Sequence, residues 1–190
     1  MPGYGYSIPA TACKVGTLLR SVKGSTCSKC YALKGRYSFP NVQNAMQRRL
    51  ESISSPGWTV AMVELIRRKA KKVPYFRWHD SGDIQNLEHL ENIVLIAHNF
   101  PGMSFWLPTR ETAIVKSFLA ENPQGFPANL CVRISAPMVG RAPEKISGTV
   151  GSSVDNPSAF QCPAPNQGNS CGPCRACWNP NVEEVSYRKH

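Results

Sequence analysis

The sequence predicts an α/β fold with a small open or partial parallel sheet, similar to part of a β/α barrel, and with irregular, cysteine-rich segments at both ends. The middle of the chain repeats a short apolar strand, a polar turn and an amphipathic helix, which is the pattern of parallel strands joined by right-handed crossovers. Both ends are rich in turn residues and together hold seven of the eight cysteines. A length of 190 residues fits one domain, which we take to be residues 1–190.

Four helices are expected, over residues 41–53, 58–72, 86–99 and 112–121. Asn41 is the expected N-cap of the first helix, because its side chain can accept a hydrogen bond from an N–H group of the first turn. In the second helix, Val60, Val63 and Ile66 recur at helical spacing and are expected to face the core. Pro74 prevents this helix from continuing, because proline lacks the N–H group that a helix requires.

Three strands are expected over residues 75–78, 103–107 and 129–134, and a fourth over residues 146–150. The first two are followed by polar segments, residues 79–83 and 109–111. Parallel α/β folds place their sites where the C-terminal ends of strands open into loops, so both polar segments are expected at the site. Three or four strands cannot close an eight-stranded barrel, so we expect the sheet to be open.

The charge and hydropathy of the chain limit the classes of partner that it can have. The formal net charge is +10, and the densest basic segment, residues 67–72, ends a predicted helix. Cations are favourable at that end of a helix, so a solvated helix end is the preferred interpretation and nucleic-acid binding is the alternative. No segment approaches the roughly 20 apolar residues of a membrane span, so no membrane partner is expected. The N-terminus does not resemble a secretory signal, so structural disulfides are not expected either.

The most informative motif is the segment Cys171-Gly-Pro-Cys174-Arg-Ala-Cys177, which is preceded by Cys162-Pro163. Iron–sulfur proteins use cysteines at this spacing because a turn-rich loop brings several thiolates to separate irons of one cluster, while a more distant cysteine supplies a further bond. Bacterial ferredoxins also place a proline directly after the outlying ligand. We therefore expect these four cysteines to bind a [4Fe–4S] cluster.

Cys13, Cys27 and Cys30 are further candidate metal ligands. They can hold a second cluster, or they can share one cluster with the C-terminal cysteines. Zinc is the alternative metal, because two Cys-x-x-Cys knuckles commonly surround one zinc ion, and here Cys27-x-x-Cys30 and Cys174-x-x-Cys177 have that spacing. The remaining cysteine, Cys131, lies in an apolar strand and is expected to be a small buried side chain rather than a ligand.

The polar segment after the first predicted strand, His79-Asp-Ser-Gly-Asp83, contributes three candidate cofactor-binding residues. His79 is a candidate base or ligand, and Asp80 and Asp83 are candidates for binding a cation or the amine of a cofactor. The alternative is a hydrogen-bonded turn in which Asp83 caps the following helix.

Three other polar features are assigned structural roles. Arg110 and Glu111 are expected to form an ion pair at the end of the second strand, and an anion site is the alternative. His89 and His98, in the helix that follows the first strand, are expected on the surface.

Four motifs together resemble the mycobacteriophage gene product 88 family, and they cover most of the chain: Cys27-Ser-Lys-Cys30-Tyr-Ala-Leu-Lys-Gly, Phe76-Arg-Trp-His-Asp-Ser-Gly-Asp83, Phe105-Trp-Leu-Pro-Thr-Arg110 and the C-terminal cysteine run. This resemblance implies a viral iron–sulfur protein in the cytoplasm of a bacterial host. For such a cluster-binding protein we expect a role in electron transfer or in redox-linked interference with the host, through a host redox partner.

The segment around Cys27 and Cys30 is also similar to the cluster loop of radical S-adenosylmethionine enzymes, which usually reads Cys-x3-Cys-x2-Cys. This sequence departs from that motif, because Cys13 precedes Cys27 by 14 residues. A radical S-adenosylmethionine enzyme is therefore the alternative function, and a zinc-stabilised nucleic-acid-binding module is a third. The sequence leaves open whether the protein is an enzyme.

Overall fold

A computed structural model describes residues 1–70 and 73–189 and contains one open sheet of seven parallel strands. Neighbouring strands follow the order β1-β2-β3-β4-β5-β7-β6. The strands are β1 (Tyr4–Tyr6), β2 (Tyr75–Trp78), β3 (Ser104–Thr109), β4 (Leu130–Ser135), β5 (Val150–Val154), β6 (Phe160–Gln161) and β7 (Glu184–Tyr187). The predicted open parallel α/β sheet is therefore confirmed, although it has more strands than the sequence indicated.

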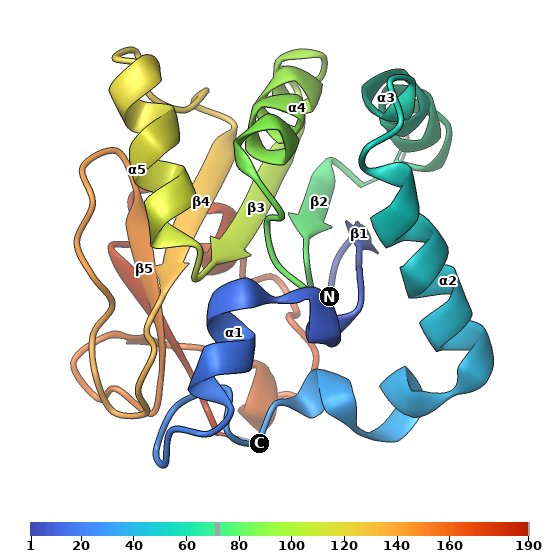
Figure 1. Ribbon diagram of the computed structural model, residues 1–190. Coiled ribbons are helices and arrows are strands. Elements are labelled where there is room, and N and C mark those ends of the chain that lie inside the picture. Colours follow the sequence, from blue (N-terminus) through green and yellow to red (C-terminus); the bar gives the residue numbers. More distant parts are fainter. Residues whose placement is uncertain (71–72, 190) are drawn as a thin grey trace.

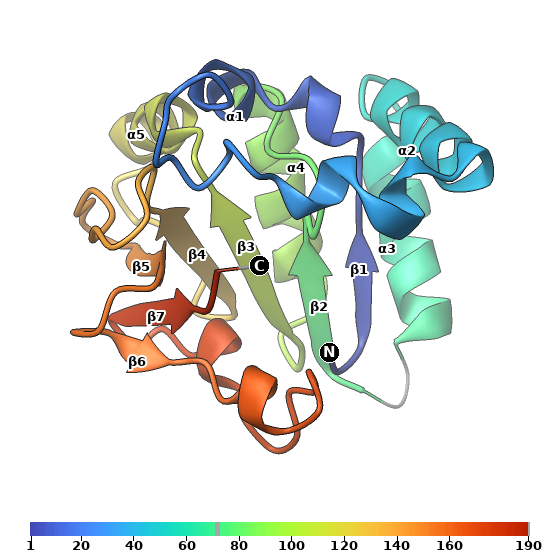
Figure 2. The ribbon, with the colours of Figure 1, turned by 90° about the horizontal axis from the view of Figure 1, so that it is seen from below.

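Four helices pack on one side of this sheet: three of them cover its face, and the first of the four along the chain lies beyond the edge strand β1 (Figures 1 and 2). They are α2 (Pro40–Ser52), α3 (Trp58–Lys69), α4 (Leu87–His98) and α5 (Thr112–Glu121). A shorter helix, α1 (Lys14–Leu19), and the segment that follows it lie instead across the C-terminal ends of the strands, as both ribbon views show (Figures 1 and 2). The loops after the strands and the N-terminal segment therefore meet at one edge of the sheet.

The main hydrophobic core lies between the sheet and these four helices. Alternate strand residues such as Phe76, Trp78 and Phe105 point into it, as expected for strands with one face against helices. From α3 the buried residues Trp58 and Met62 contribute, and they are four positions apart, so they lie on one face of the helix. This packing fixes the orientation of the strands, whose C-terminal ends lead into the loops that form the site.

Part of the opposite face of the sheet is covered by the C-terminal segment (Figure 2). Here Trp106 packs with Cys177, Trp178 and Val185 in a second, smaller hydrophobic cluster. The fold thus buries both faces of the central strands, which is typical of parallel sheets. The cysteine-rich C-terminal segment is part of this second layer rather than an appended tail.

The helices differ from the sequence prediction mainly in the start of the first helix, the end of the second helix and the buried face of the second helix. The first helix begins after Phe39 with Pro40 in its first turn, so Asn41 is not its N-cap; proline suits that position because its missing N–H group would have no helical partner there. The second helix ends at Lys69, and residues 71 and 72 of the predicted span lie outside the described residues. Val60 is 73% exposed rather than buried, because the buried face contains Trp58 and Met62.

The strands differ mainly in the second half of the chain. The predicted strand over 146–150 is wrong in position, because β5 spans Val150–Val154. The short strands β1, β6 and β7 were not expected. Strand β3 continues to Thr109, two residues beyond the prediction, and includes Pro108. Within the described part of the chain, no helix is both long enough and apolar enough to cross a bilayer.

Candidate functional site

The seven candidate cysteine ligands form two separate groups. Cys13, Cys27 and Cys30 make up the N-terminal cysteine group, in which burial, followed by the charges of Asp83, Cys30 and Cys27, raises the pKa of Cys13 to about 12. The C-terminal cysteine group consists of Cys162, Cys171, Cys174 and Cys177. Its members also act on one another. Burial raises the pKa of Cys162, a hydrogen bond from the backbone of Ala164 opposes this shift, and the nearby Cys171 and Cys174 raise the pKa further.

The N-terminal cysteine group lies where strands β2 and β3 end. Cys13 directly precedes α1, and the backbone N–H of Cys30 donates to the carbonyl of Cys27 at 3.2 Å, which closes the Cys-x-x-Cys turn. Thr26, next to Cys27, accepts a hydrogen bond from Arg110 at 2.7 Å, and its own N–H donates to the carbonyl of Pro137 at 2.9 Å. Contacts from β3 and from the segment after β4 thus position this turn.

Gly16 supplies the clearest sign that the N-terminal cysteine group is built to approach a common centre. A Cβ atom at this position would lie 2.9 Å from the Cβ of Cys13 and 3.6 Å from the sulfur atoms of both Cys13 and Cys27. The absence of a side chain therefore leaves space directly beside two thiols. Thiolates are the ligands of iron–sulfur clusters, so the donor set fits such a group.

A cavity of about 710 Å³ opens at the same edge of the sheet. All three cysteines of the N-terminal group line it, and so do His79, Asp80, Asp83 and Arg110, as the position of the polar turns predicted. The volume is in the range of small-molecule sites in proteins. None of the four C-terminal cysteines is among the residues that line it.

The polar segment after β2 divides between structural and cavity-lining roles. Asp83 is buried and accepts hydrogen bonds from the Thr109 hydroxyl at 2.6 Å, the Arg110 N–H at 2.9 Å and the Ile84 N–H at 2.8 Å. Burial raises its pKa to about 6, although these hydrogen bonds oppose the shift. It joins the ends of β2 and β3, and the predicted N-cap role belongs instead to Asn86, whose side chain accepts from the His89 N–H at 2.8 Å.

Asp80 and His79 are held in different ways. One carboxylate oxygen of Asp80 accepts from the Tyr37 hydroxyl at 2.9 Å, and the other contacts the Ser7 hydroxyl. His79 has a positive φ of 53°, which is rare outside glycine, and its buried ring packs against that of His89 with centroids 5.3 Å apart. Burial lowers the pKa of His79 well below its usual value, so this imidazole is neutral.

Two structural assignments made from the sequence are wrong. His89 is fully buried, and burial lowers its pKa to about 4; it faces the core because α4 turns this position toward Trp58 and His79. Arg110 and Glu111 do not pair with each other in the described structure: the Arg110 guanidinium donates to Thr26, whereas the Glu111 carboxylate accepts from the N–H of Val15 at 3.0 Å. Both residues hold the N-terminal segment over the strand ends.

The C-terminal cysteine group is fixed to the sheet by Arg133, which sequence reasoning did not select. This fully buried side chain of β4 donates five hydrogen bonds of 2.7–3.0 Å. The acceptors are the backbone carbonyls of Gly151, Ala176, Cys177, Asn179 and Val182. An arginine inside the apolar run Leu-Cys-Val-Arg-Ile was the available signal, because a buried guanidinium needs several acceptors.

The remaining contacts of the C-terminal cysteine group define its surroundings. The N–H of Cys174 donates to the carbonyl of Cys171 at 3.0 Å, and the Cys177 sulfur lies 3.2 Å from the Tyr187 hydroxyl. Cys131 is buried in β4, as expected. Since Cys27 and Cys30 belong to the other group, the two Cys-x-x-Cys knuckles are not brought together as the zinc alternative required.

Within the described residues, no three His, Cys, Asp or Glu side chains are close enough to surround a single metal ion. A cluster differs from a single ion in this respect, because each thiolate binds a different iron and the sulfur atoms can lie farther apart. The functional assignment therefore depends on how the cysteines are divided, with three in the N-terminal cysteine group and four in the C-terminal cysteine group.

The chain was compared with protein families, with curated proteins and with solved structures. The sequence matches the Gene product 88 family over residues 1–180. No curated protein and no solved structure matches the chain. Since the family match includes both cysteine groups and every strand except the last, the chain belongs to the Gene product 88 family, a family of phage gene products.

Proposed function

We propose that this phage protein is an iron–sulfur protein with two [4Fe–4S] sites, one in each cysteine group. The observation that carries the proposal is the division of seven cysteines into a group of four packed against the sheet and a group of three beside a cavity. Four thiolates complete the protein ligation of a cluster, whereas three leave one iron without a cysteine. The two groups therefore suit different tasks.

The C-terminal cysteine group suits electron transfer. Cys162 and Cys174 pack against the hydrophobic side chains of Trp106, Trp178 and Val185. Arg133 donates hydrogen bonds to the backbone carbonyls of Ala176, Cys177 and Asn179. Such fixed, apolar surroundings limit reorganisation and help to set the reduction potential of a bound cluster. A redox partner from the host cytoplasm is the interaction that this role requires.

Iron analysis of cysteine variants tests the two-site proposal. Cys27→Ala and Cys174→Ala should each retain about half of the wild-type iron, since each removes a ligand from one group only, and the double variant should retain almost none. Cys131→Ala is the matched control, because it removes a buried thiol outside both groups. Complete iron loss in either single variant would show that all seven cysteines serve one site and would refute the division.

The cavity favours a second candidate function, that of a radical S-adenosylmethionine enzyme. The N-terminal cysteine group provides three ligands at the C-terminal edge of a parallel sheet, beside a cavity of about 710 Å³. In such enzymes a reduced cluster supplies the electron that cleaves S-adenosylmethionine. Here the cluster would be bound by the three cysteines of the N-terminal group, Cys13, Cys27 and Cys30. The adjoining wall of the cavity contains the charged side chains of Asp80, Asp83 and Arg110.

S-adenosylmethionine itself distinguishes these functions. If an iron at the N-terminal cysteine group is open, the cofactor should alter the electron paramagnetic resonance signal of the dithionite-reduced protein, and the alteration should be lost in Cys27→Ala but kept in Cys174→Ala. Reductive cleavage with the same dependence would establish the enzyme. An unchanged signal in the iron-loaded wild type would leave electron transfer as the function.

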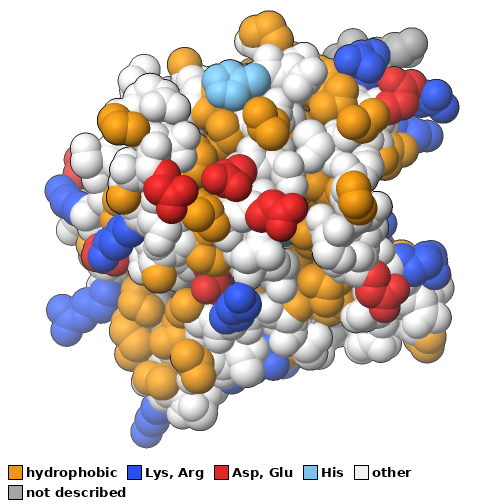
Figure 3. Space-filling model, turned by 45° about the horizontal axis from the view of Figure 1, so that its top comes forward, with side chains coloured by type: hydrophobic (Ala, Val, Ile, Leu, Met, Phe, Trp, Pro, Cys, Tyr) orange, Lys and Arg blue, Asp and Glu red, His pale blue; other side chains and the backbone are white. Residues whose placement is uncertain are grey.

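The zinc-stabilised nucleic-acid module is the least supported of the three functions. The basic residues Arg67 and Arg68 both pair with Glu64 at the end of α3. On the face to which α4 and α5 contribute, acidic side chains occupy the middle, and Lys and Arg lie mostly around the margin (Figure 3). A continuous basic surface, which phosphate binding requires, is not present on this face.

A further inference from the structure

Two hydrogen-bond donor atoms in the wall of the cavity on β2 and β3 have no acceptor among the residues that the structure describes. Arg77 and Trp106 are paired in register on these neighbouring strands, so their side chains lie on the same face of the sheet. Among the described residues, none accepts a hydrogen bond from Nε of Arg77 or from Nε1 of Trp106. Trp106 is only 5% exposed, and both residues line the cavity. Buried donors of this kind normally have a partner.

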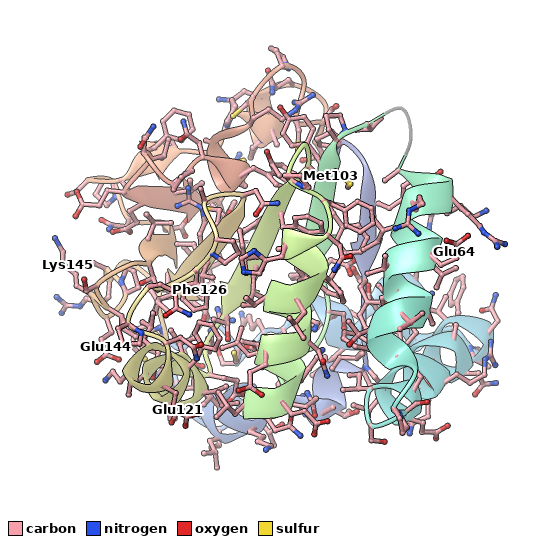
Figure 4. All side chains as sticks on the ribbon, turned by 90° about the horizontal axis from the view of Figure 1, so that it is seen from above. Glu64, Met103, Glu121, Phe126, Glu144 and Lys145 are labelled. Carbon is pink, nitrogen blue, oxygen red and sulfur yellow. The ribbon has the colours of Figure 1, made fainter. Side chains whose placement is uncertain are left out.

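Arg77 also forms no ion pair within residues 1–70 and 73–189. Its guanidinium lies over the Trp106 ring at 4.3 Å from the centroid, which fixes its orientation but supplies no anion. The guanidinium has a hydrogen bond with Tyr31, and Asp80 also attracts its charge, although the two oxygens of Asp80 already contact Tyr37 and Ser7. Neither interaction supplies an acceptor for Nε among the described residues. The ion pairs in the described structure involve the exposed residues Glu64, Glu144 and Glu183. Figure 4 shows that Glu64 and Glu144 belong to segments on opposite sides of the molecule.

Most of the other charged side chains that line the cavity are also basic. Arg110 contributes another Nε without an acceptor among the described residues, at the end of β3. Two acidic side chains, Asp80 and Asp83, line the cavity, against six basic ones. The basic residues are Arg20, Lys29, Arg77, Arg110, Arg188 and Lys189. Low-dielectric walls with an excess of one charge concentrate ligands of the opposite charge.

We propose that the cavity binds a small molecule through an anionic oxygen group, a phosphate or a carboxylate, which accepts hydrogen bonds from Arg77 and Trp106. The guanidinium provides charge and a planar set of donors, and the indole N–H adds a neutral donor beside it. This ligand site goes beyond the iron–sulfur assignment, because it depends on the wall formed by β2 and β3 and not on the cysteine groups.

Calorimetric titration of the full-length protein with inorganic pyrophosphate and, separately, with succinate tests the site. At least one probe should bind to the wild type, and Arg77→Met should weaken its binding at least tenfold. Arg68→Met is the matched control, because Arg68 is an exposed arginine that pairs with Glu64, and it should bind as the wild type does. Binding of pyrophosphate alone identifies a phosphate site, and binding of succinate alone identifies a carboxylate site. Binding of both probes shows that the site recognises anionic oxygen groups of either kind.

The indole N–H signals of a ¹⁵N-labelled sample provide an independent readout. The Trp106 signal should shift on binding, whereas those of Trp58 and Trp178 should not, because their N–H groups already donate to Tyr6 and to the Phe76 carbonyl. If Arg77→Met does not fold, Arg77→Lys and Trp106→Phe replace it and should each weaken binding.

Three results would overturn the proposed anion site: equal affinity of the Arg77 variants and the wild type, no binding of either probe, or no shift of the Trp106 signal. Iron content, measured on the same samples, reports separately on the cysteine groups. Failure of this site and failure of the iron–sulfur proposal are therefore distinguishable.

Discussion

At the scale of single residues, Arg133 is the side chain on which the C-terminal layer depends most. Replacing it with methionine removes five hydrogen bonds to backbone carbonyls. The carbonyls of Ala176 and Asn179 keep a backbone N–H donor, so up to three carbonyls lose the donor described here. Each unsatisfied group costs about 1–3 kcal/mol, and relaxation recovers part of this, so we expect Arg133→Met to lower the free energy of unfolding by about 3 kcal/mol or more. Urea denaturation measures the change, with the exposed Arg141→Met as control. Equal stability of the two variants would contradict this role.

A second residue-scale prediction concerns the buried His89. Its Nδ1 accepts a hydrogen bond from the Gln85 N–H at 3.2 Å, and burial lowers its pKa to about 4. The folded protein therefore binds fewer protons here than the unfolded chain between about pH 4 and pH 6.5, so stability falls as pH is lowered through this range, by about 3 kcal/mol in total.

Unfolding measured between pH 6.5 and pH 4.5 should show a smaller loss in His89→Phe than in the wild type. Asp83, whose raised pKa acts in the opposite direction, contributes equally to both proteins. The pKa of His79 is lowered by burial first and by His89 second, so the variant removes only the smaller of these two causes. Identical slopes would show that His89 does not titrate as its burial requires.

At the scale of elements, Gly16 in α1 tests whether the N-terminal cysteine group is shaped for a bound group. Alanine normally stabilises a helix relative to glycine by about 1 kcal/mol. At this position, however, the added Cβ would crowd Cys13 and the space beside two sulfurs. We expect Gly16→Ala to lose iron from the N-terminal cysteine group, whereas Gly102→Ala, where a Cβ would meet no atom within 4 Å, should not. Equal iron contents would argue against this shape.

The elements also show how far the sequence could predict this fold. The long helices and strands β2, β3 and β4 were recognisable because each has a clear apolar period or run. Strands β1, β6 and β7 have two to four residues each, and β5 has small polar residues at its centre, so none has a hydrophobic pattern of its own. They pair because neighbouring strands offer a free edge, which is a tertiary effect.

The site was predictable to a similar extent. Cysteine spacing and the polar segments after strands identified some of the residues that line the cavity, but not Arg77 or Trp106, and not which cysteines would be brought together. That division depends on hydrogen bonds across long sequence separations, such as those of Arg110 with Thr26 and of Arg133 with Cys177. For the same reason, the burial of His89 could not be inferred from its own helix.

At the scale of the whole molecule, the fold places two cysteine groups on one sheet in different surroundings. One lies across the C-terminal ends of β2 and β3, beside the cavity, and the other lies in the layer that covers the far face. The loss of a cluster ligand removes binding energy that is also folding energy. Cys174→Ala should therefore lower the melting temperature of the iron-loaded protein more than Cys131→Ser does, and an equal effect of the two would contradict this coupling.

The most direct test of the iron–sulfur assignment is the iron, sulfide and zinc content of protein purified without oxygen, together with its absorption spectrum. Two [4Fe–4S] sites predict a brown protein with broad absorption near about 400 nm and about eight irons and eight sulfides per chain. Colourless protein that takes up stoichiometric zinc and no iron on reconstitution would contradict the assignment.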